Sequence, residues 1–378
     1  MPNAAIDQRT LLENVKIVAL ATGLRMSEDV LRRYGGHDAL TVHEYATTGG
    51  VTLVLPDDVL VNAPFDEPFC AASPLELVNA GDALELRLGD RVVPVVDLLP
   101  LPGYLGVVAA DGAPAAATTM SHADRIRVSP IDGCSYNCGF CNLPGTYRPH
   151  PVEQVLAGID VALRDDALPA RHLLISGGSP SRAQPQLDYF RDVCVGILRH
   201  VRRVTEGRAG GFTTDIMMSA RADGPAFVEQ MAAEGCDGFS LNVEAFSEEG
   251  ATRHLPLKHK LARPHLEAMV RHAVAIYGRG SGKVRSLIIP GLEKSEQTLE
   301  GVEWLASLGC HPVISPFRPA RNTKLHAAPT VAPDVLRVVL EESRRIVRRH
   351  GVTLGPRCVA CQHNILSFPW DLEPREVL

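Results

Sequence analysis

From residue 125 to residue 350 the chain alternates short apolar runs with longer segments of helical periodicity. The six apolar runs are predicted strands at 126–129, 172–176, 212–219, 237–243, 283–289 and 312–315. The helices predicted after them cover 151–164, 186–204, 225–234, 263–277, 295–308 and 333–350. Because helical crossovers join parallel strands, this order predicts an α/β fold with a parallel sheet. Six detectable units predict a partial (β/α)6, TIM-like barrel.

The first 120 residues follow a different pattern. A predicted amphipathic helix at 8–20 is followed by short strand-like runs that turn signals separate, at 51–55, 83–88 and 91–96. A segment of small residues without periodicity, 109–119, is a predicted linker. The predicted parts are an N-terminal α+β extension over 1–120, the barrel core over 121–330, and a C-terminal helix with a cysteine-containing tail over 331–378.

Composition excludes several classes of protein. The chain has 378 residues, of which 45% are hydrophobic and 22% are charged, so it is neither disordered nor fibrous. A net charge of −6 disfavours binding to duplex nucleic acid, which requires neutralisation of phosphates. No apolar run approaches the roughly 20 residues of a membrane span. The polar N-terminal residues lack the pattern of a secretion signal, so we expect a cytoplasmic protein with reduced thiols.

Three of the nine cysteines form a C-x3-C-x2-C motif directly after the first predicted strand: Cys134, Cys138 and Cys141. Closely spaced thiolates suit an iron–sulfur cluster. Three cysteines leave one iron of a four-iron cluster without a protein ligand, and that iron can bind a small chelating molecule. A zinc site and a redox cluster with a distant fourth cysteine are the alternatives. The loop lies at the carboxyl end of the strand, where barrels of this type bind ligands.

With this motif, the sequence from 125 to 364 resembles the radical S-adenosylmethionine (radical SAM) superfamily. The resemblance implies that the three cysteines hold a [4Fe-4S] cluster whose open iron binds the amino and carboxylate groups of SAM. It also implies that Phe140 packs near the adenine. The Gly-Gly-Glu-type turn of the family corresponds here to Ser176, Gly177, Gly178 and Ser179, in which Ser179 replaces the acidic residue.

Later strands carry the other SAM contacts that the resemblance implies. Ser240, Asn242 and Glu244 alternate on one face of the fourth strand and its exit. Ile289 and Gly291 belong to a fifth-strand motif near the adenine. The sixth strand ends in Pro-Phe-Arg-Pro at 316–319, which is similar to the biotin-synthase-like branch of the family.

The activity that the resemblance implies is reductive cleavage of SAM to a 5′-deoxyadenosyl radical. This radical abstracts hydrogen from a small-molecule substrate, in a reaction of specialised metabolism. A one-electron donor such as flavodoxin or ferredoxin is the implied partner. Tyr147, Arg148 and Arg318 are candidate substrate contacts. The basic run at 258–260 is interpreted as the solvent-exposed start of a helix.

Cys358 and Cys361 form a second constellation, C-x2-C followed by His363. They are candidates for an active-site thiol or for a second metal site, with further ligands from Cys310, His311 or Cys70; two inert thiols are the alternative. If a thiol met the unique iron or the substrate, SAM cleavage with transfer of its 3-amino-3-carboxypropyl group would become possible. A non-catalytic zinc-binding protein is the remaining alternative.

Overall fold

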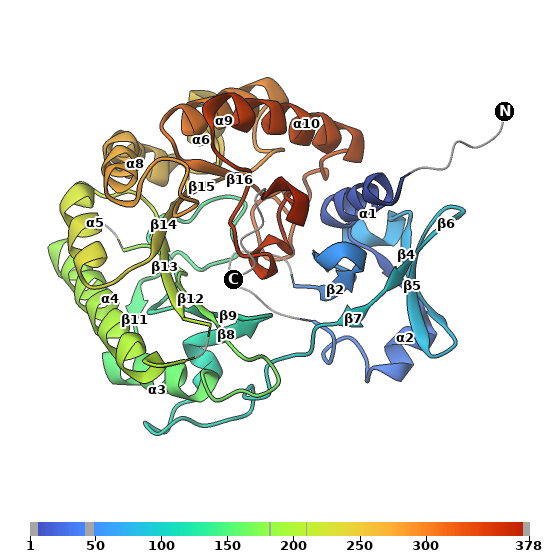
Figure 1. The fold of residues 1–378 in the computed structure, drawn as a ribbon, viewed down its shortest axis with the longest axis horizontal. Helices are drawn as coiled ribbons and strands as arrows, with labels where there is room; N and C mark the ends of the chain where they lie inside the picture. Colours follow the sequence, from blue (N-terminus) through green and yellow to red (C-terminus); the bar gives the residue numbers. More distant parts are fainter. Residues whose placement is uncertain (1–6, 42–48, 181–182, 209, 373–378) are drawn as a thin grey trace.

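Six parallel strands, each followed by at least one helix, form the centre of the molecule (Figure 1). The computed structural model describes residues 7–41, 49–180, 183–208 and 210–372. The parallel strands are β9 (Arg125–Val128), β12 (His172–Ile175), β13 (Thr213–Met218), β14 (Gly238–Leu241), β15 (Val284–Ile288) and β16 (His311–Ile314). They are adjacent in sequence order, and β8 (Thr119–His122) adds an antiparallel edge beside β9. The predicted partial barrel is confirmed.

The predicted helices are all present, with ends that differ from prediction by a few residues. They are α3 (Val152–Ala162), α4 (Gln184–Thr205), α5 (Gly224–Ala233), α8 (Arg263–Tyr277), α9 (Ser295–Ser307) and α10 (Pro333–His350). Gly351 ends α10 in the left-handed conformation that glycine favours. Two short helices that were not predicted, α6 (Glu248–His254) and α7 (Pro256–Leu261), lie between β14 and α8.

Because side chains alternate along each strand, one face of the sheet packs in a hydrophobic layer against the helices and the other face lines a more polar interior. On β9, Ile126 and Val128 pack in the hydrophobic core, whereas Arg125 and Arg127 line the interior of the barrel. On β12, Leu173 and Ile175 are likewise buried in the core. Because successive strand residues point to opposite faces, the apolar runs seen in the sequence also carry inward polar residues.

The N-terminal part contains two further sheets beside the barrel (Figure 1). One sheet has the order β1-β4-β5-β6 and the other the order β3-β2-β7. Their strands are β1 (Arg25–Met26), β2 (Val51–Leu55), β3 (Val59–Ala63), β4 (Leu75–Ala80), β5 (Ala83–Leu88), β6 (Arg91–Val95) and β7 (Asp97–Leu98). Of these, β1, β3, β4 and β7 were not predicted. The helices are α1 (Gln8–Thr22) and α2 (Glu28–Arg33), and α1 packs against α10.

Part of the segment predicted as a linker is folded and packs against the barrel. A single 3-10 turn, Ala115–Ala117, contacts α3, and β8 begins directly afterwards at Thr119. The Thr119 hydroxyl donates to the Ala115 carbonyl at 2.8 Å. A short hairpin of β10 (Ile131–Asp132) and β11 (Arg148–Pro149) brackets the cysteine loop. No helix in the described ranges has the length and apolar character needed to cross a bilayer.

The C-terminal tail occupies the free edge of β16. Gly355 donates its N–H to Pro312 of β16 at 2.8 Å, and Leu366 donates to Ile314 at 2.7 Å. On the other side of the tail, Asn62 of β3 donates to the His363 carbonyl at 2.7 Å. The tail therefore joins the open edge of the barrel to the N-terminal part.

Lys16 of α1 binds the backbone of this tail. Its fully buried ammonium donates to the carbonyls of Gln362 and Ser367, each at 2.8 Å, and lies 4.9 Å from the centre of the Phe368 ring. Burial lowers the pKa of Lys16 to about 7, although Asp371 opposes that change.

We predict that this buried lysine makes stability depend on pH. Above pH 7 the folded state begins to lose the Lys16 proton, whereas the unfolded chain keeps it until about pH 10.4, so the free energy of unfolding rises between these values. Relative to Lys16→Met, the wild type is expected to gain about 3 kcal/mol between pH 7 and about 9.5 in denaturant titrations. Lys260→Met, at an exposed position, serves as the control. Parallel pH curves for wild type and Lys16→Met would contradict the prediction.

Candidate functional site

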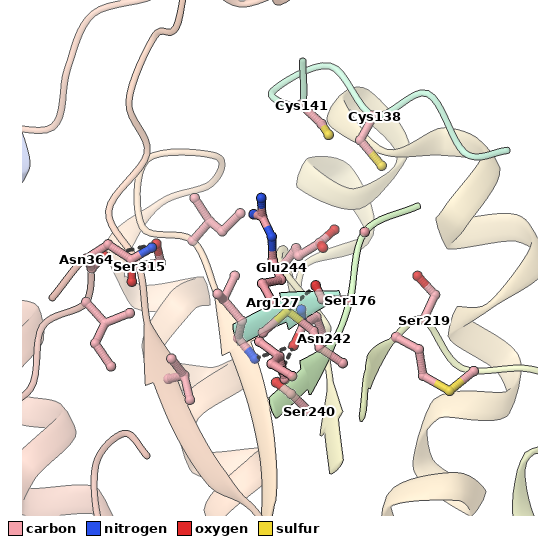
Figure 2. A pocket seen from close by; sticks show the side chains of 18 of the residues that line it. Arg127, Cys138, Cys141, Ser176, Ser219, Ser240, Asn242, Glu244, Ser315 and Asn364 are labelled. Atoms are coloured by element: carbon pink, nitrogen blue, oxygen red, sulfur yellow. Dashed lines mark hydrogen bonds between the residues drawn. The ribbon is translucent and has the colours of Figure 1, made fainter. Parts of the chain in front are cut away.

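A cavity of about 260 Å³ occupies the interior of the barrel and receives side chains from all six parallel strands, the cysteine loop and the C-terminal tail. Most of the predicted site residues line it. These are Cys134, Cys138, Phe140, Cys141, Ser176, Gly177, Ser179, Ser240, Asn242, Glu244, Ile289, Arg318, Cys358 and Cys361. Figure 2 shows Cys138 and Cys141 on their loop above the strand ends that carry Ser176, Asn242 and Glu244.

Gly178 and Gly291 are not among the lining residues, and the geometry shows what each position requires. A Cβ on Gly178 would lie 1.6 Å from the Gly133 carbonyl oxygen, because the turn after β12 packs directly on the cysteine loop. Gly291 has a φ of +102°, and a Cβ there would lie 3.0 Å from that of Phe317, which lines the cavity. Both glycines therefore allow close backbone packing around the site.

Tyr147 and Arg148, which were predicted as substrate contacts, lie outside the cavity lining. Arg148 is exposed on β11 and forms an ion pair with Asp132 at 2.6 Å. Tyr147 is half-buried and packs against the main hydrophobic core. The structure thus brings Arg318, but not these two residues, to the cavity.

The cysteine loop is held by backbone contacts on several sides. Cys134 donates its N–H to the Pro144 carbonyl at 2.9 Å, and Gly139 donates to His254 of α6 at 2.7 Å. The Ser179 N–H lies 3.4 Å from the Cys134 sulfur, which it can reach as a donor. Burial raises the pKa of Cys141 to about 12 and also raises that of Cys138. As thiols these groups stay protonated at neutral pH, so metal binding would release protons.

A buried ion pair lies beside this loop. The Lys258 ammonium is 2.8 Å from Glu244 Oε1, and the two side chains are only 7% and 14% exposed. Glu244 adopts a φ of +66°, a strained conformation for a residue other than glycine. Its second oxygen, Oε2, is buried without a hydrogen-bond partner among the described residues. The expectation that Lys258 is solvent-exposed was wrong, because the unpredicted helix α7 turns it inward.

Polar side chains at the strand ends are fixed by one another. The Asn242 Oδ1 accepts from the Ser240 hydroxyl at 2.8 Å and from the Leu287 N–H at 3.2 Å. The Ser179 hydroxyl is 3.2 Å from that of Ser219 on the neighbouring strand end. Asn242 lies at a strand end below the cysteine loop (Figure 2), and Ser179 lines the same cavity.

The C-terminal thiols lie at the opposite, amino-terminal end of the strands. The Cys361 sulfur is 3.4 Å from His172 Nδ1, on the first residue of β12, and the Cys358 sulfur is 3.8 Å from Asp124, which directly precedes β9. On the far side of the imidazole, His172 Nε2 is 3.2 Å from Asp215. We call Asp124, His172, Asp215, Cys358 and Cys361 the barrel floor.

His172 is the residue of this group that sequence reasoning missed. The partners considered for the thiols are engaged elsewhere: His311 contacts Thr353 and Gly282, Cys70 contacts the Pro64 carbonyl, and Cys310 lies in the core. The only sign of it in the sequence was a histidine at the first position of a predicted strand. His172 is far from both thiols in sequence, so nothing linked it to them.

Charge coupling on the barrel floor is strong. Burial opposes protonation of His172, but Cys361 and Asp215 outweigh it and raise its pKa to about 10. A hydrogen bond from Cys358, together with the His172 cation, holds the pKa of Cys361 well below its usual range. Burial likewise opposes ionisation of Asp215, yet Arg285 at 2.5 Å and His172 keep the pKa of that carboxyl low. The raised pKa of His172 and the lowered pKa of Cys361 thus favour a pair of opposite charges beside the Asp215 carboxylate.

Residues 128–315 match the family model of the Radical SAM superfamily. The chain belongs to this superfamily. Membership confirms the predicted enzyme class and the predicted cofactors, a [4Fe-4S] cluster and SAM. The biotin-synthase-like branch stays a prediction. No curated protein matches the chain in sequence.

Solved structures of radical SAM enzymes are similar to this chain at low identity. HydG, a maturase of the [FeFe]-hydrogenase, has 15% identity and a TM-score of 0.46, over 60% of this chain and 50% of HydG. A radical SAM methyltransferase from Sphaerobacter thermophilus has 20% identity and a TM-score of 0.46, over 78% of this chain and 81% of the other. Coproporphyrinogen III oxidase HemN from Escherichia coli has 17% identity and a TM-score of 0.45, over 66% and 59%. The match thus spans half the length of HydG.

We predict that Gly178→Ala impairs assembly of the cluster. The new Cβ would collide with the Gly133 carbonyl and approach the Cys134 Cα to 3.1 Å, which displaces the cysteine loop. Iron and sulfide per chain after anaerobic reconstitution are expected to fall by more than about twofold. In the control, Gly196→Ala on α4, the nearest described atom to the new Cβ is at 3.6 Å, so the cluster content should stay that of wild type. Equal iron in both variants would show that the close packing is not required.

Proposed function

We propose that this enzyme cleaves SAM reductively to a 5′-deoxyadenosyl radical, which abstracts hydrogen from a small molecule bound inside the barrel. In this proposal Cys134, Cys138 and Cys141 hold the cluster at the carboxyl ends of the strands. The supporting observation is that these cysteines, the Gly-Gly turn and the carboxyl ends of β14 and β15 all meet at one cavity.

The donor set fits a [4Fe-4S] cluster with one open iron. Thiolates are the preferred ligands of such clusters, and the lining of this end of the cavity supplies three of them. The other lining cysteines, Cys358 and Cys361, lie at the far end of strands that are about 13 Å long for four residues. When bound and reduced, the cluster supplies the electron that breaks the sulfonium C–S bond of SAM.

Glu244 and Lys258 are well suited to bind the amino-acid part of SAM. The buried Oε2 of Glu244 lacks a hydrogen donor among the described residues, and the SAM ammonium can donate to it. The Lys258 ammonium holds the other oxygen at 2.8 Å and keeps the carboxylate in place. Phe140 and Ile289 supply apolar surface for the adenine, as the family resemblance implies. Ser176, Gly177 and Ser179 present polar groups and backbone near the amino group.

The substrate occupies the middle of the cavity, below SAM. Arg127 of β9, Met217 of β13 and Ser240 of β14 face this space, and Arg318 enters from the loop after β16. Two arginines in a low-dielectric pocket favour a polar substrate that carries an anionic group. The surrounding strands exclude water, which protects a reactive radical from side reactions. An external one-electron donor, such as flavodoxin or ferredoxin, would supply the electron that reduces the cluster before SAM is cleaved.

The position of the C-terminal thiols bears on the alternative reaction. Transfer of the 3-amino-3-carboxypropyl group was considered because a thiol near the unique iron could steer SAM cleavage. Cys358 and Cys361 contact residues at the amino ends of β9 and β12, away from the cysteine loop. Their position therefore supports 5′-deoxyadenosyl chemistry over thiol-steered cleavage at the cluster.

Product analysis tests this function. Anaerobically reconstituted enzyme with dithionite and SAM is expected to form 5′-deoxyadenosine, and Cys138→Ala is expected to form none. Cys194→Ala, which removes a fully buried thiol from the core of α4, should keep the activity. Formation of methylthioadenosine would favour the transfer alternative, whereas reconstituted enzyme that leaves SAM intact would overturn the proposal.

We further predict that Glu244→Gln weakens SAM binding. Removing a charge-assisted hydrogen bond of about 1.5 kcal/mol raises the Kd for SAM roughly tenfold. Equilibrium binding of SAM to the reconstituted enzyme measures this change. Glu248→Gln, at an exposed carboxylate on α6, is the matched control and should bind as wild type does. Unchanged affinity in Glu244→Gln would remove Glu244 from the SAM site.

A further inference from the structure

The geometry points to a zinc site at the barrel floor, with His172, Cys358 and Cys361 as ligands. This site goes beyond the proposed function, because the residues belong to the opposite end of the cavity from the cysteine loop. It uses neither the cluster nor SAM. The ligands are His172 Nδ1 and the two cysteine sulfurs, with a fourth position open to the cavity.

The three ligand atoms lie close together, and one of the distances between them matches that of a tetrahedral site. Each of them lies within 4.8 Å of the other two. For Zn–S bonds of about 2.3 Å and a Zn–N bond of about 2.05 Å at tetrahedral angles, sulfur and nitrogen should be about 3.5 Å apart. The Cys361 sulfur and His172 Nδ1 are 3.4 Å apart. Little movement is therefore needed to admit the ion.

A carboxylate lies close to the second nitrogen of the imidazole. His172 Nε2 is 3.2 Å from Asp215, which Arg285 holds at 2.5 Å. Metal-binding histidines usually donate their other ring N–H to a carboxylate, which fixes the ring and raises its basicity. In this structure Nε2 has no hydrogen bond of good geometry among the described residues, so the ring must turn slightly for its N–H to donate to Asp215. His172, Asp215 and Arg285 lie on three strands of the sheet.

The two thiols are held on one tight turn. The Cys361 N–H lies 3.1 Å from the Cys358 carbonyl and 3.3 Å from the Cys358 sulfur, so it can stabilise a thiolate at that position. The turn is fixed by Lys16, which binds the Gln362 carbonyl, and by the backbone bonds that join the tail to β16. Both thiols are thus positioned before a metal arrives.

The donor set and its charge favour zinc over a second iron–sulfur cluster. A closed cluster requires four thiolates, whereas the floor offers two thiolates and one imidazole. Two thiolates neutralise Zn²⁺, which lowers the cost of burying the charge. Asp124 lies 3.8 Å from the Cys358 sulfur but outside the group of three. The fourth position therefore takes water or a donor atom of a molecule in the cavity, as at zinc sites that keep an open position.

Metal analysis of full-length protein tests the site independently of SAM cleavage. In the variant Cys134→Ala/Cys138→Ala/Cys141→Ala, which lacks the proposed cluster ligands, dialysis against Zn²⁺ and then buffer should leave about one zinc per chain. Zinc K-edge absorption of this protein should show two sulfur ligands, with nitrogen or oxygen for the rest. Adding His172→Gln or Cys361→Ser should lower the zinc content by at least about tenfold.

Two substitutions serve as matched controls for the floor variants. His200→Gln replaces a similarly buried histidine that pairs with Asp160 on the outer helices, and Cys310→Ser replaces a core cysteine. Both should keep the zinc. The inference is overturned if the triple-alanine protein retains no zinc, if it binds iron instead, or if the absorption spectrum lacks sulfur ligands. It is also overturned if the floor variants and the controls bind zinc equally. Because the spectrum needs no floor variant, misfolding of one cannot hide the answer, and wild-type SAM cleavage is measured separately.

Discussion

The free edge of β16 is the constraint on which much of this structure depends. A sheet of six parallel strands does not close on itself, and its last strand presents unpaired backbone groups that require a partner. The tail supplies that partner through the bonds of Gly355 and Leu366. By pairing there, the tail also lines the cavity and places two thiols in its wall. The same segment, the C-terminal tail, thus pairs with the edge of the barrel and supplies the thiols of its floor.

Ion pairing explains why so much charge is tolerated inside the barrel. Inward positions carry Arg285 and Asp215 at one level and Glu244 and Lys258 at another, and each charge is paired with its opposite. Unpaired, such groups would cost several kcal/mol each. One of these ion pairs lies toward each end of the strands, so both ends of the interior are polar. The carboxyl end suits SAM and the cluster, and the amino end offers sulfur and nitrogen donors.

The sequence was sufficient for what depends on local pattern. Alternating periodicity located the six βα units, and cysteine spacing with the Gly-Gly turn located the residues at the carboxyl end of the cavity. What it missed depends on tertiary packing. Lys258 looked like a surface residue because α7, which turns it inward, is short and has no strong periodicity. His172 could be joined to Cys361 only through the path of the tail, since 189 positions separate them. The need for glycine at 178 arises because the turn after β12 packs against the cysteine loop, a contact between segments that are distant in sequence.

Contact between distant segments also has a consequence for the order of assembly. Lys16 and Ser367 are 351 positions apart, yet the Lys16 ammonium donates to the Ser367 carbonyl at 2.8 Å. Contacts of such sequence separation form late, because a long loop must close before they contribute. The cysteine loop, by contrast, is bounded by strands β9 and β12 that are near in sequence. The bonds between Lys16 and the tail are therefore expected to form late in folding, after the pairing of β9 with β12 around the cysteine loop.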